Sequence, residues 1–468
     1  MTDTDLCFTP AVELRRLIAA KQLGPVELMD AVIARAEALE PTLNGLATPT
    51  FEAARAEARA SAERLAKGEP RGPLEGIPCT IKDLVMTKGV RTMAGSRIHA
   101  NRVPEVDGPV VDRLRDAGAI AFGKTTVPEF GWIGCGDSPA TGTTHNPWKP
   151  GYNAGGSSSG AGALAAAGVG PLHQGSDGAG SIRMPAAFCG IYGIKPSFGR
   201  VPNWPQSNND FNSHIGPMTR TVADAALMLA AMAGPDDRDL TSLEGAPAAY
   251  LDALDRPIAG LKVAYSPDLG YLDVDAEVSG PVRAAVAAFE ELGCHVEEVG
   301  RLWDDPGEIA RCYWSSHQAG NLAPYLDRWA PEMDPGLLAC AEHGRGYSVV
   351  DYVQNKQKRL NFYDEVRRFF ERYDLLLTPT LSVAAFPVGR IIPEHWPQHP
   401  WDWLRWAGFS YPFNLSWVPA ATCPCGFTPD GRPIGLQIVG PRLEDLRVLQ
   451  ASRAFEQARP WAQHRPSL

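Results

Sequence analysis

Residues 155–183 read GGSSSGAGALAAAGVGPLHQGSDGAGSIR, with three serines between glycines and a fourth, Ser181, after a second glycine-rich turn. The stretch belongs to a region, starting at GIPCTIKD (76–83), in which short apolar runs bounded by Gly and Pro alternate with helical segments such as VVDRLRDAG (110–118). This alternation is typical of α/β proteins. It predicts one sheet that is covered by helices on both faces.

The pattern changes on either side of this region. Residues 1–70 repeat apolar and charged positions at helical spacing, which predicts three surface helices in VELRRLIAAKQLG, PVELMDAVIARAEALE and FEAARAEARASAERLAKG. Further along, we expect strands in LKVAYSPD, HVEEV and DLLLTP and helices in PVRAAVAAFEELG and DEVRRFFERY. Residues 303–373 are predicted to be mainly helical, as a cap or an insertion. No linker long enough to separate independent domains is present, so we expect one domain over residues 1–468.

Composition and charge exclude several classes of protein. The chain has 468 residues, of which 44% are hydrophobic and 21% charged, as in soluble globular proteins. A net charge of -10 argues against nucleic-acid and anionic membrane partners. The N-terminus shows no secretory signal, the longest apolar run is too short to span a bilayer, and the scattered cysteines are expected to be reduced and mostly buried. We therefore expect a cytoplasmic protein and leave its oligomeric state open.

One motif points to nucleotide binding. The string GAIAFGKT (118–125) matches the phosphate-loop pattern G-x-x-x-x-G-K-[ST]. That motif needs a flexible loop between a strand and a helix. Here the helical segment VVDRLRDA precedes Gly118, and the spacer AIAF is itself strand-like. Gly118 is therefore predicted to end a helix and AIAF to form a buried strand, which leaves no loop to hold phosphate.

A second motif suggests a nucleophile elbow. GSSSG (156–160) fits the pattern G-x-S-x-G, with Ser158 as candidate nucleophile. An elbow requires a strand directly before the serine, and an acid and then a histidine later in the chain. The preceding HNPWKPGYNAGG has the character of a loop, and His173 comes before any candidate acid. The elbow is therefore the weaker alternative.

Lys82 offers a third constellation. It follows the apolar run 77–81 and is expected at the end of a buried strand. An ordinary lysine would pair with a neighbour such as Asp83. Adjacent side chains of a strand point to opposite faces, so Asp83 need not neutralise Lys82. A lysine in an apolar pocket has a lowered pKa and can act as a neutral base.

Four stretches of the chain resemble the amidase signature family of serine hydrolases. They are PLEGIPCTIKD, GGSSSGAGALAAAG and GSDGAGSIRMPAAFCGIYGIKPSFGRV, which lie within residues 73–201, and the C-terminal PCGFTPDGRPIGLQIVG. The spacing agrees as well as the letters, because Ser181 lies 24 residues after Ser157, as the nucleophile and bridging serine of the family do. The resemblance implies a single large α/β/α domain with a mixed central sheet.

The resemblance also implies roles for particular residues. It makes Ser181 the nucleophile, Ser157 the bridging serine in a cis peptide bond with Gly156, and Lys82 the base. The backbone N–H groups of Gly178, Ala179, Gly180 and Ser181 would form the oxyanion hole. Ser158 would support the relay, and Asp177 and Arg183 would hold the turn. The family commonly has two glycines directly before the nucleophile, and Ala179 departs from this pattern. The sequence leaves open whether its small methyl group narrows the oxyanion hole.

The implied reaction is hydrolysis of carbon–nitrogen amide bonds through an acyl-enzyme, with no metal and no cofactor. The variant DGAGS resembles the branch that contains aryl acylamidases, nylon-oligomer hydrolases and urethanases. Since amide, ester and carbamate carbonyls pass through similar tetrahedral species, small molecules of all three kinds are candidate substrates.

Aromatic residues gather near the C-terminus. Five of the twelve tryptophans lie in the segment 395–417. Core packing is the ordinary role of any one of these rings. As a cluster in a segment with little strand or helix periodicity, they predict a loop that walls the substrate pocket and favours bulky apolar or aryl groups. The candidate wall residues are Trp403, Trp406, Phe409 and Trp417.

Two other functions remain as alternatives. The glutaminase subunit of a tRNA-dependent amidotransferase shares the same catalytic groups, but it would need a partner protein and a polar, charged pocket. The tryptophan-rich segment argues against that pocket. A catalytically silent member of the family would act as a binding protein, and the intact set of Lys82, Ser157 and Ser181 argues against this alternative.

Overall fold

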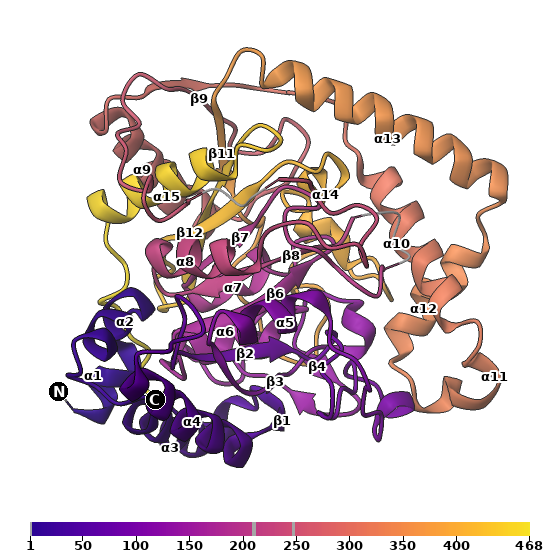
Figure 1. Ribbon diagram of the computed structural model, residues 1–468. Helices are drawn as coiled ribbons and strands as arrows, with labels where there is room; N and C mark the ends of the chain where they lie inside the picture. The colour runs from indigo at the N-terminus through magenta and orange to yellow at the C-terminus, as the bar shows by residue number, and fades with distance from the viewer. Residues whose placement is uncertain (1, 208–211, 246–248) are drawn as a thin grey trace.

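A central sheet of eleven strands organises the computed structural model, which describes residues 2–207, 212–245 and 249–468 (Figure 1). Residue 1 of the predicted helical region 1–70, and residues 208–211 and 246–248 of the predicted single domain, lie outside the described residues. In sheet order the strands are β1 (Leu46–Pro49), β3 (Ile120–Thr125), β2 (Pro78–Lys82), β6 (Leu172–Asp177), β8 (His214–Thr219), β7 (Tyr192–Lys195), β12 (Ala420–Phe427), β13 (Pro433–Val439), β11 (Leu375–Pro379), β9 (Lys262–Tyr265) and β10 (His295–Glu298). A separate two-stranded sheet consists of β4 (Asp137–Ser138) and β5 (Gly142–Thr143).

The sheet is mixed, as predicted. β2 is parallel to both β3 and β6, and β9 is parallel to both β10 and β11. The remaining neighbours in the large sheet are antiparallel. Because β2 and β6 run in the same direction side by side, their carboxyl ends meet at one edge of the sheet. This pairing brings Lys82, the last residue of β2, beside the turn that follows Asp177, the last residue of β6.

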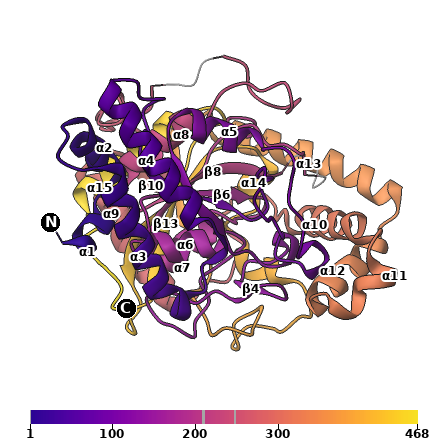
Figure 2. The same cartoon turned by 60° about the horizontal axis from the view of Figure 1, so that its bottom comes forward.

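Helices pack on both faces of the sheet, which confirms the predicted α/β/α arrangement (Figures 1 and 2). Strand β11 shows the two faces directly, because Leu375 and Leu377 belong to one hydrophobic cluster and Leu376 to another. The helices are α1 (Asp3–Phe8), α2 (Ala11–Ala19), α3 (Pro25–Leu43), α4 (Phe51–Lys67), α5 (Pro109–Asp116), α6 (Ser159–Ala166), α7 (Arg183–Cys189), α8 (Val222–Met232), α9 (Ala276–Glu291), α10 (Gly307–Leu322), α11 (Leu326–Trp329), α12 (Pro335–Arg345), α13 (Val349–Phe369), α14 (Pro412–Leu415) and α15 (Asp445–Ala458). No helix in the described ranges is both long and apolar enough to cross a membrane.

The N-terminal region contains the three predicted helices as α2, α3 and α4, and two further elements. Helix α1 has only six residues and begins at a capping box on Thr2. Strand β1 has four residues and pairs antiparallel with β3. Both elements are too short to show a hydrophobic period, which explains why the sequence pattern does not reveal them.

The phosphate-loop match is a helix end followed by a strand, as predicted. Gly118 follows α5 with a φ of 90°, in the left-handed region that favours glycine, and β3 begins at Ile120. Lys124 is buried, and its Nζ donates hydrogen bonds to Val85 O and to the hydroxyls of Thr87 and Thr92. The lysine of the motif is therefore committed to protein partners.

Residues 303–373 contain four α-helices, α10 to α13, which lie together to one side of the sheet (orange in Figure 1). Helix α10 packs against both α12 and α13. The predicted strands in 261–268, 295–299 and 374–379 are present as β9, β10 and β11. The predicted helices in 281–293 and 364–373 overlap α9 and α13, which end earlier, at Glu291 and Phe369.

Gly160 allows α6 to pack closely against the backbone of neighbouring segments, which can be tested by substitution. A Cβ atom at this position would lie 2.1 Å from the carbonyl oxygen of Gly45 and 2.7 Å from the backbone nitrogen of Thr126. Because backbone atoms cannot easily give way, we expect Gly160→Ala to lower the free energy of unfolding by about 1–3 kcal/mol. Gly300→Ala is the matched control, since a Cβ at Gly300 meets nothing within 4 Å. Urea unfolding followed by circular dichroism checks this, and equal midpoints for the two variants would contradict it.

Candidate active site

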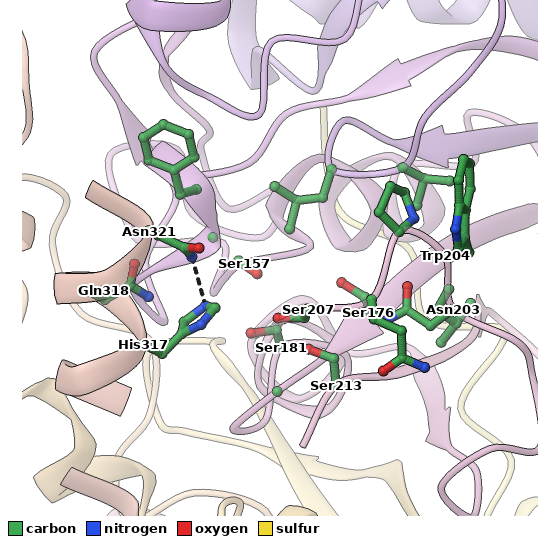
Figure 3. A pocket seen from close by; sticks show the side chains of 18 of the residues that line it. Ser157, Ser176, Ser181, Asn203, Trp204, Ser207, Ser213, His317, Gln318 and Asn321 are labelled. Atoms are coloured by element: carbon green, nitrogen blue, oxygen red, sulfur yellow. Dashed lines mark hydrogen bonds between the residues drawn. The ribbon is translucent and has the colours of Figure 1, made fainter. Parts of the chain in front are cut away.

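A cavity of about 320 Å³ opens where β2 and β6 end (Figure 3). Its walls come from the loops after β2 and β3, from the loop before α6, from the end of β6 and the turn after it, from β8 and the segment before it, and from α10. The lining residues are Leu84, Val85, Phe130, Gly131, Ser157, Ser176, Gly178, Ser181, Asn203, Trp204, Pro205, Gln206, Ser207, Ser213, Ile215, Trp314, His317, Gln318 and Asn321.

Lys82 lies beneath the cavity floor with its side chain wholly buried. Its Nζ is 2.8 Å from Ser157 Oγ, 3.0 Å from Ser176 Oγ and 3.2 Å from the Ser176 carbonyl oxygen. Burial lowers the pKa of Lys82 to about 7, and the charge of Asp177 offsets part of that effect. A substantial fraction of this amine is therefore neutral near physiological pH.

Asp83 points away from Lys82, as the strand geometry predicts. Its carboxylate accepts a hydrogen bond from the Met93 N–H at 3.0 Å. Burial raises the pKa of Asp83 to about 6, and the charge of Lys124 acts against that increase. Asp83 therefore belongs to the environment of Lys124, and Lys82 has no carboxylate in direct contact among the described residues.

Ser157 and Ser181 share a wall of the cavity, and each is 3% exposed. The Gly156–Ser157 peptide bond is cis, as the family resemblance implies. Within the described ranges no hydrogen bond joins the hydroxyls of Ser157 and Ser181. The structure thus brings Lys82 and Ser157 into contact, and it places Ser181 beside them with its hydroxyl available to a ligand.

Ser158 lies behind the cavity and does not line it. Its hydroxyl donates to the Ser176 carbonyl oxygen at 3.2 Å, and its N–H donates to the Ser181 carbonyl oxygen, also at 3.2 Å. Ser158 follows a loop and directly precedes α6. No strand leads into it, so the nucleophile-elbow alternative lacks the geometry it requires.

Asp177 and Arg183 form a buried ion pair that fixes the turn before Ser181. The Arg183 Nε donates to Asp177 Oδ2 and the Arg183 Nη2 donates to Asp177 Oδ1, both at 2.9 Å. Both side chains are fully buried. Burial alone would raise the pKa of Asp177, but the charge and hydrogen bonds of Arg183 outweigh it and hold that pKa below its ordinary value.

The same pair connects the turn to the C-terminal part of the chain. Arg183 also donates to the carbonyl oxygen of Ser410 and to side-chain oxygens of Asn414 and Gln437. In return, Asn414 Nδ2 donates to the Asp177 carboxylate at 2.9 Å. These three residues complete the support of the turn, and the sequence pattern does not identify them.

The backbone of the turn corrects one part of the predicted oxyanion hole. The Gly180 N–H donates to Asp177 Oδ1 at 2.6 Å, so this N–H points to the carboxylate. The N–H groups of Gly178, Ala179 and Ser181 have no partner in the described part of the chain. Gly180 has a φ of 117°, and a Cβ there would lie 2.6 Å from the Ser410 Cβ, so the position requires glycine.

The methyl group of Ala179 lies away from the cavity. It is 3% exposed and belongs to a hydrophobic cluster with Met184 and Trp406. It is not one of the residues that line the cavity described above. Its methyl group therefore packs into the core, and the departure from the family pattern leaves the mouth of the site unchanged.

The rings of the tryptophan-rich segment 395–417 do not line the cavity, and the prediction that this segment walls the pocket is corrected. Trp403, Trp406 and Phe409 are fully buried, and none of them lines the cavity. The Nε1 of Trp403 donates to the Trp132 carbonyl oxygen at 3.0 Å, so even its polar atom is committed to the backbone. Trp417, also predicted to line the pocket, instead stacks on Phe198 at 4.7 Å.

Two other segments form most of the cavity wall. Residues 203–207 and 213 contribute from the stretch before β8, and α10 contributes Trp314, His317, Gln318 and Asn321. The α10 residues are spaced i, i+3, i+4 and i+7, which places them on one face of the helix. That spacing is visible in the sequence, but a polar helical face is more often turned to solvent.

The described residues include no group of three or more His, Cys, Asp or Glu side chains that could hold a metal ion. All nine cysteines are free, and all but Cys425 are buried. Cys423 and Cys425, close in sequence, are therefore packing residues.

Known proteins match the chain almost from end to end. The Amidase family matches residues 27–449. An acylamidase of Rhodococcus erythropolis is 40% identical over 479 aligned residues, which cover 100% of this chain and 99% of that protein. A glutamyl-tRNA(Gln) amidotransferase subunit from Synechococcus sp. (strain RCC307) is 37% identical, covering 94% and 95%. The crystal structure of a bacterial aryl acylamidase of the amidase signature enzymes family superposes with a TM-score of 0.91 at 30% identity, covering 97% of each chain.

The fold, the cavity and these matches define an enzyme that hydrolyses amides. The chain belongs to the amidase signature family.

Loss of the Arg183 side chain should lower the stability of the folded protein. Arg183→Met would leave the Asp177 carboxylate buried without its cation, so we expect the free energy of unfolding to fall by about 3–5 kcal/mol. Arg283→Met is the matched control, because Arg283 pairs with Glu298 at the exposed surface, with side chains 59% and 50% exposed. We expect this control to leave the urea midpoint almost unchanged. A similar small shift for both variants would contradict the anchoring role of the Asp177–Arg183 pair.

Proposed function

We propose that this enzyme cleaves uncharged amides with aryl or other bulky apolar groups through an acyl-enzyme on Ser181, with Ser157 passing the proton to Lys82. The observation that carries the proposal is the 2.8 Å contact between Lys82 Nζ and Ser157 Oγ at a fully buried amine. A buried, neutral lysine is a base that can work near pH 7.

Ser176 orients the amine in this proposal. A neutral lysine has two N–H donors and one lone pair. The hydroxyl and the carbonyl oxygen of Ser176 both lie within hydrogen-bond distance of Nζ and can take the two N–H groups. The lone pair of Lys82 is then directed at the hydroxyl of Ser157, which is the orientation a base requires.

The proposed cycle moves one proton along this line. Ser181 Oγ attacks the carbonyl carbon while its proton passes to Ser157 and the proton of Ser157 passes to Lys82. The proton then returns to the leaving nitrogen as the carbon–nitrogen bond breaks, and water hydrolyses the Ser181 ester by the same route. Catalytic hydrogen bonds are often long before substrate binds, so we expect the Ser157–Ser181 contact to tighten in the complex. The N–H groups of Gly178, Ala179 and Ser181 are the candidate donors to the oxyanion.

The chemistry of the cavity supports uncharged, aryl-sized substrates. Its rings come from Phe130, Trp204 and Trp314, and its polar groups are neutral hydroxyls, carboxamides and one imidazole. No Asp, Glu, Lys or Arg is among the described lining residues. The acylamidase and the aryl acylamidase among the relatives support the same class. Esters and carbamates of similar shape are proposed as secondary substrates.

The amidotransferase relative keeps the glutaminase function as a second candidate. Glutamine carries both a carboxylate and an ammonium group, and recognition of these groups calls for charged partners. The described walls of the cavity offer none, which favours the amidase function. Glutamine hydrolysis, or co-purification with a second protein, would favour the alternative. The contact of the buried Lys82 amine with Ser157 also argues against a catalytically silent binding protein. The nine cysteines are free, which supports the proposal that the protein is located in the reducing cytoplasm.

Single substitutions test the proposed roles. We expect Ser181→Ala and Lys82→Met to lower kcat for a nitroanilide by a factor of about 10,000 or more, because each removes a group on which the relay depends. Ser157→Ala should cost about 100- to 10,000-fold, as for loss of a proton-transfer group. Ser158→Ala is the matched control and should cost less than about tenfold. A loss in Ser158→Ala as large as that in Ser181→Ala would contradict the assignment.

The pKa of Lys82 gives a pH dependence. Only the neutral amine can accept the proton, and the neutral fraction grows as pH rises through about 7. We expect kcat/KM to rise about tenfold between pH 6 and pH 8 and then to level off. Measurement with an uncharged nitroanilide avoids titration of the substrate. A profile that is flat over this range, or that rises only above pH 9, would contradict a buried Lys82 base.

A further inference from the structure

One face of α10 forms a wall of the cavity beside the candidate nucleophile. In Figure 3 the side chains of His317, Gln318 and Asn321 project from this helix toward the part of the cavity that holds Ser157 and Ser181. A substrate that is bound to Ser181 and fills the cavity would therefore contact this wall.

Gln318 carries a buried polar atom that lacks a partner. Gln318 is 1% exposed, and its carboxamide oxygen is shielded from water and accepts no hydrogen bond from any residue in the described ranges. Buried side-chain oxygens nearly always have a donor. An unsatisfied acceptor on the wall of a ligand cavity indicates that the donor arrives with the ligand.

The polar neighbours of Gln318 on this face contact each other. The side chains of Asn321 and His317 are hydrogen-bonded, with 3.1 Å between Asn321 Nδ2 and His317 Nε2. Apolar rings dominate the rest of this side, since Trp314 lies one turn away and Phe130 comes from another loop. The carboxamide oxygen of Asn321 also has no partner in the described ranges, but it is not shielded from water. Gln318 is therefore the residue of this wall whose buried acceptor lacks a donor.

Amide, carbamate and ester substrates differ in whether they can donate a hydrogen bond to the Gln318 oxygen. A secondary amide or an N-substituted carbamate has an N–H group at the reacting bond, and an ester of the same shape has an oxygen there. We infer that Gln318 accepts a hydrogen bond from the N–H of the scissile amide or carbamate and thereby selects these substrates over esters. This inference rests on the proposed function.

The geometry and the energetics of a carboxamide suit this role. The last torsion of a glutamine side chain is broad, so a modest turn brings the oxygen to the cavity surface. A site built to accept a hydrogen bond discriminates strongly against an analogue that lacks the donor, because the acceptor then stays buried without a partner. Gln318 would thus act as a specificity residue, while the relay performs the chemistry.

A pair of substrates that differ only in this group tests the inference. We would measure kcat/KM for 4-nitroacetanilide and for 4-nitrophenyl acetate with the wild-type enzyme and with Gln318→Met. We expect the substitution to lower the anilide-to-ester ratio about 10- to 100-fold. Gln318→Glu keeps an acceptor of similar reach and should retain most of the ratio. Because Gln318→Met removes an unsatisfied buried oxygen, its urea midpoint should equal or exceed that of the wild type.

Asn321→Leu provides the matched control on the same wall, and we expect it to change both substrates by a similar factor. The inference is overturned when Gln318→Met changes both substrates equally, or when Asn321→Leu lowers the ratio as much as Gln318→Met does. A wild-type enzyme that cleaves the ester and not the anilide would overturn the proposed function as well. The two failures are therefore distinguishable.

Discussion

The buried carboxylate of Asp177 is the constraint on which the site depends. It receives N–H groups from Gly180 and Ile182, two hydrogen bonds from the Arg183 guanidinium, and one from the Asn414 carboxamide. Two charges without water are tolerable only when geometry and hydrogen bonds compensate for the lost hydration. Arg183 extends the network to Gln437 on β13. The turn that presents Ser181 is thereby joined both to α7, through Arg183 itself, and to strands that are formed more than 200 residues later in the chain.

The topology of the sheet supplies the second half of the site. β2 and β6 are parallel neighbours, so Lys82 emerges beside the turn that Asp177 holds. The amine loses its hydration there and gains three oxygen neighbours, none of them charged. This environment lowers the pKa of Lys82 to about 7. The structure thus brings a base, Lys82, into contact with Ser157 without a histidine. The proposed relay follows from the position of Lys82 at the end of β2.

Much of this arrangement could be predicted from the sequence, because short stretches of neighbouring residues determine it. The apolar run 77–81 identifies the strand that ends at Lys82, and the family resemblance, which includes the spacing of Ser157 and Ser181, identifies the site. The strand that ends at Asp177 has no apolar run and was not predicted. The prediction for the segment 395–417 is wrong because composition does not tell whether Trp403 faces a cavity or the core. The orientation of the Gly180 N–H depends on backbone torsions that no residue pattern encodes. The α10 wall depends on which face of this helix meets the cavity, and tertiary packing decides this.

Trapping the activated serine tests whether Lys82 activates Ser181. A small fluorophosphonate reacts with a serine only where a base removes its proton, and peptide mapping by mass spectrometry then locates the adduct. We expect a single adduct on Ser181 that is lost in Lys82→Met. An adduct on Ser158, or labelling of Ser181 that is unchanged in Lys82→Met, would contradict this expectation.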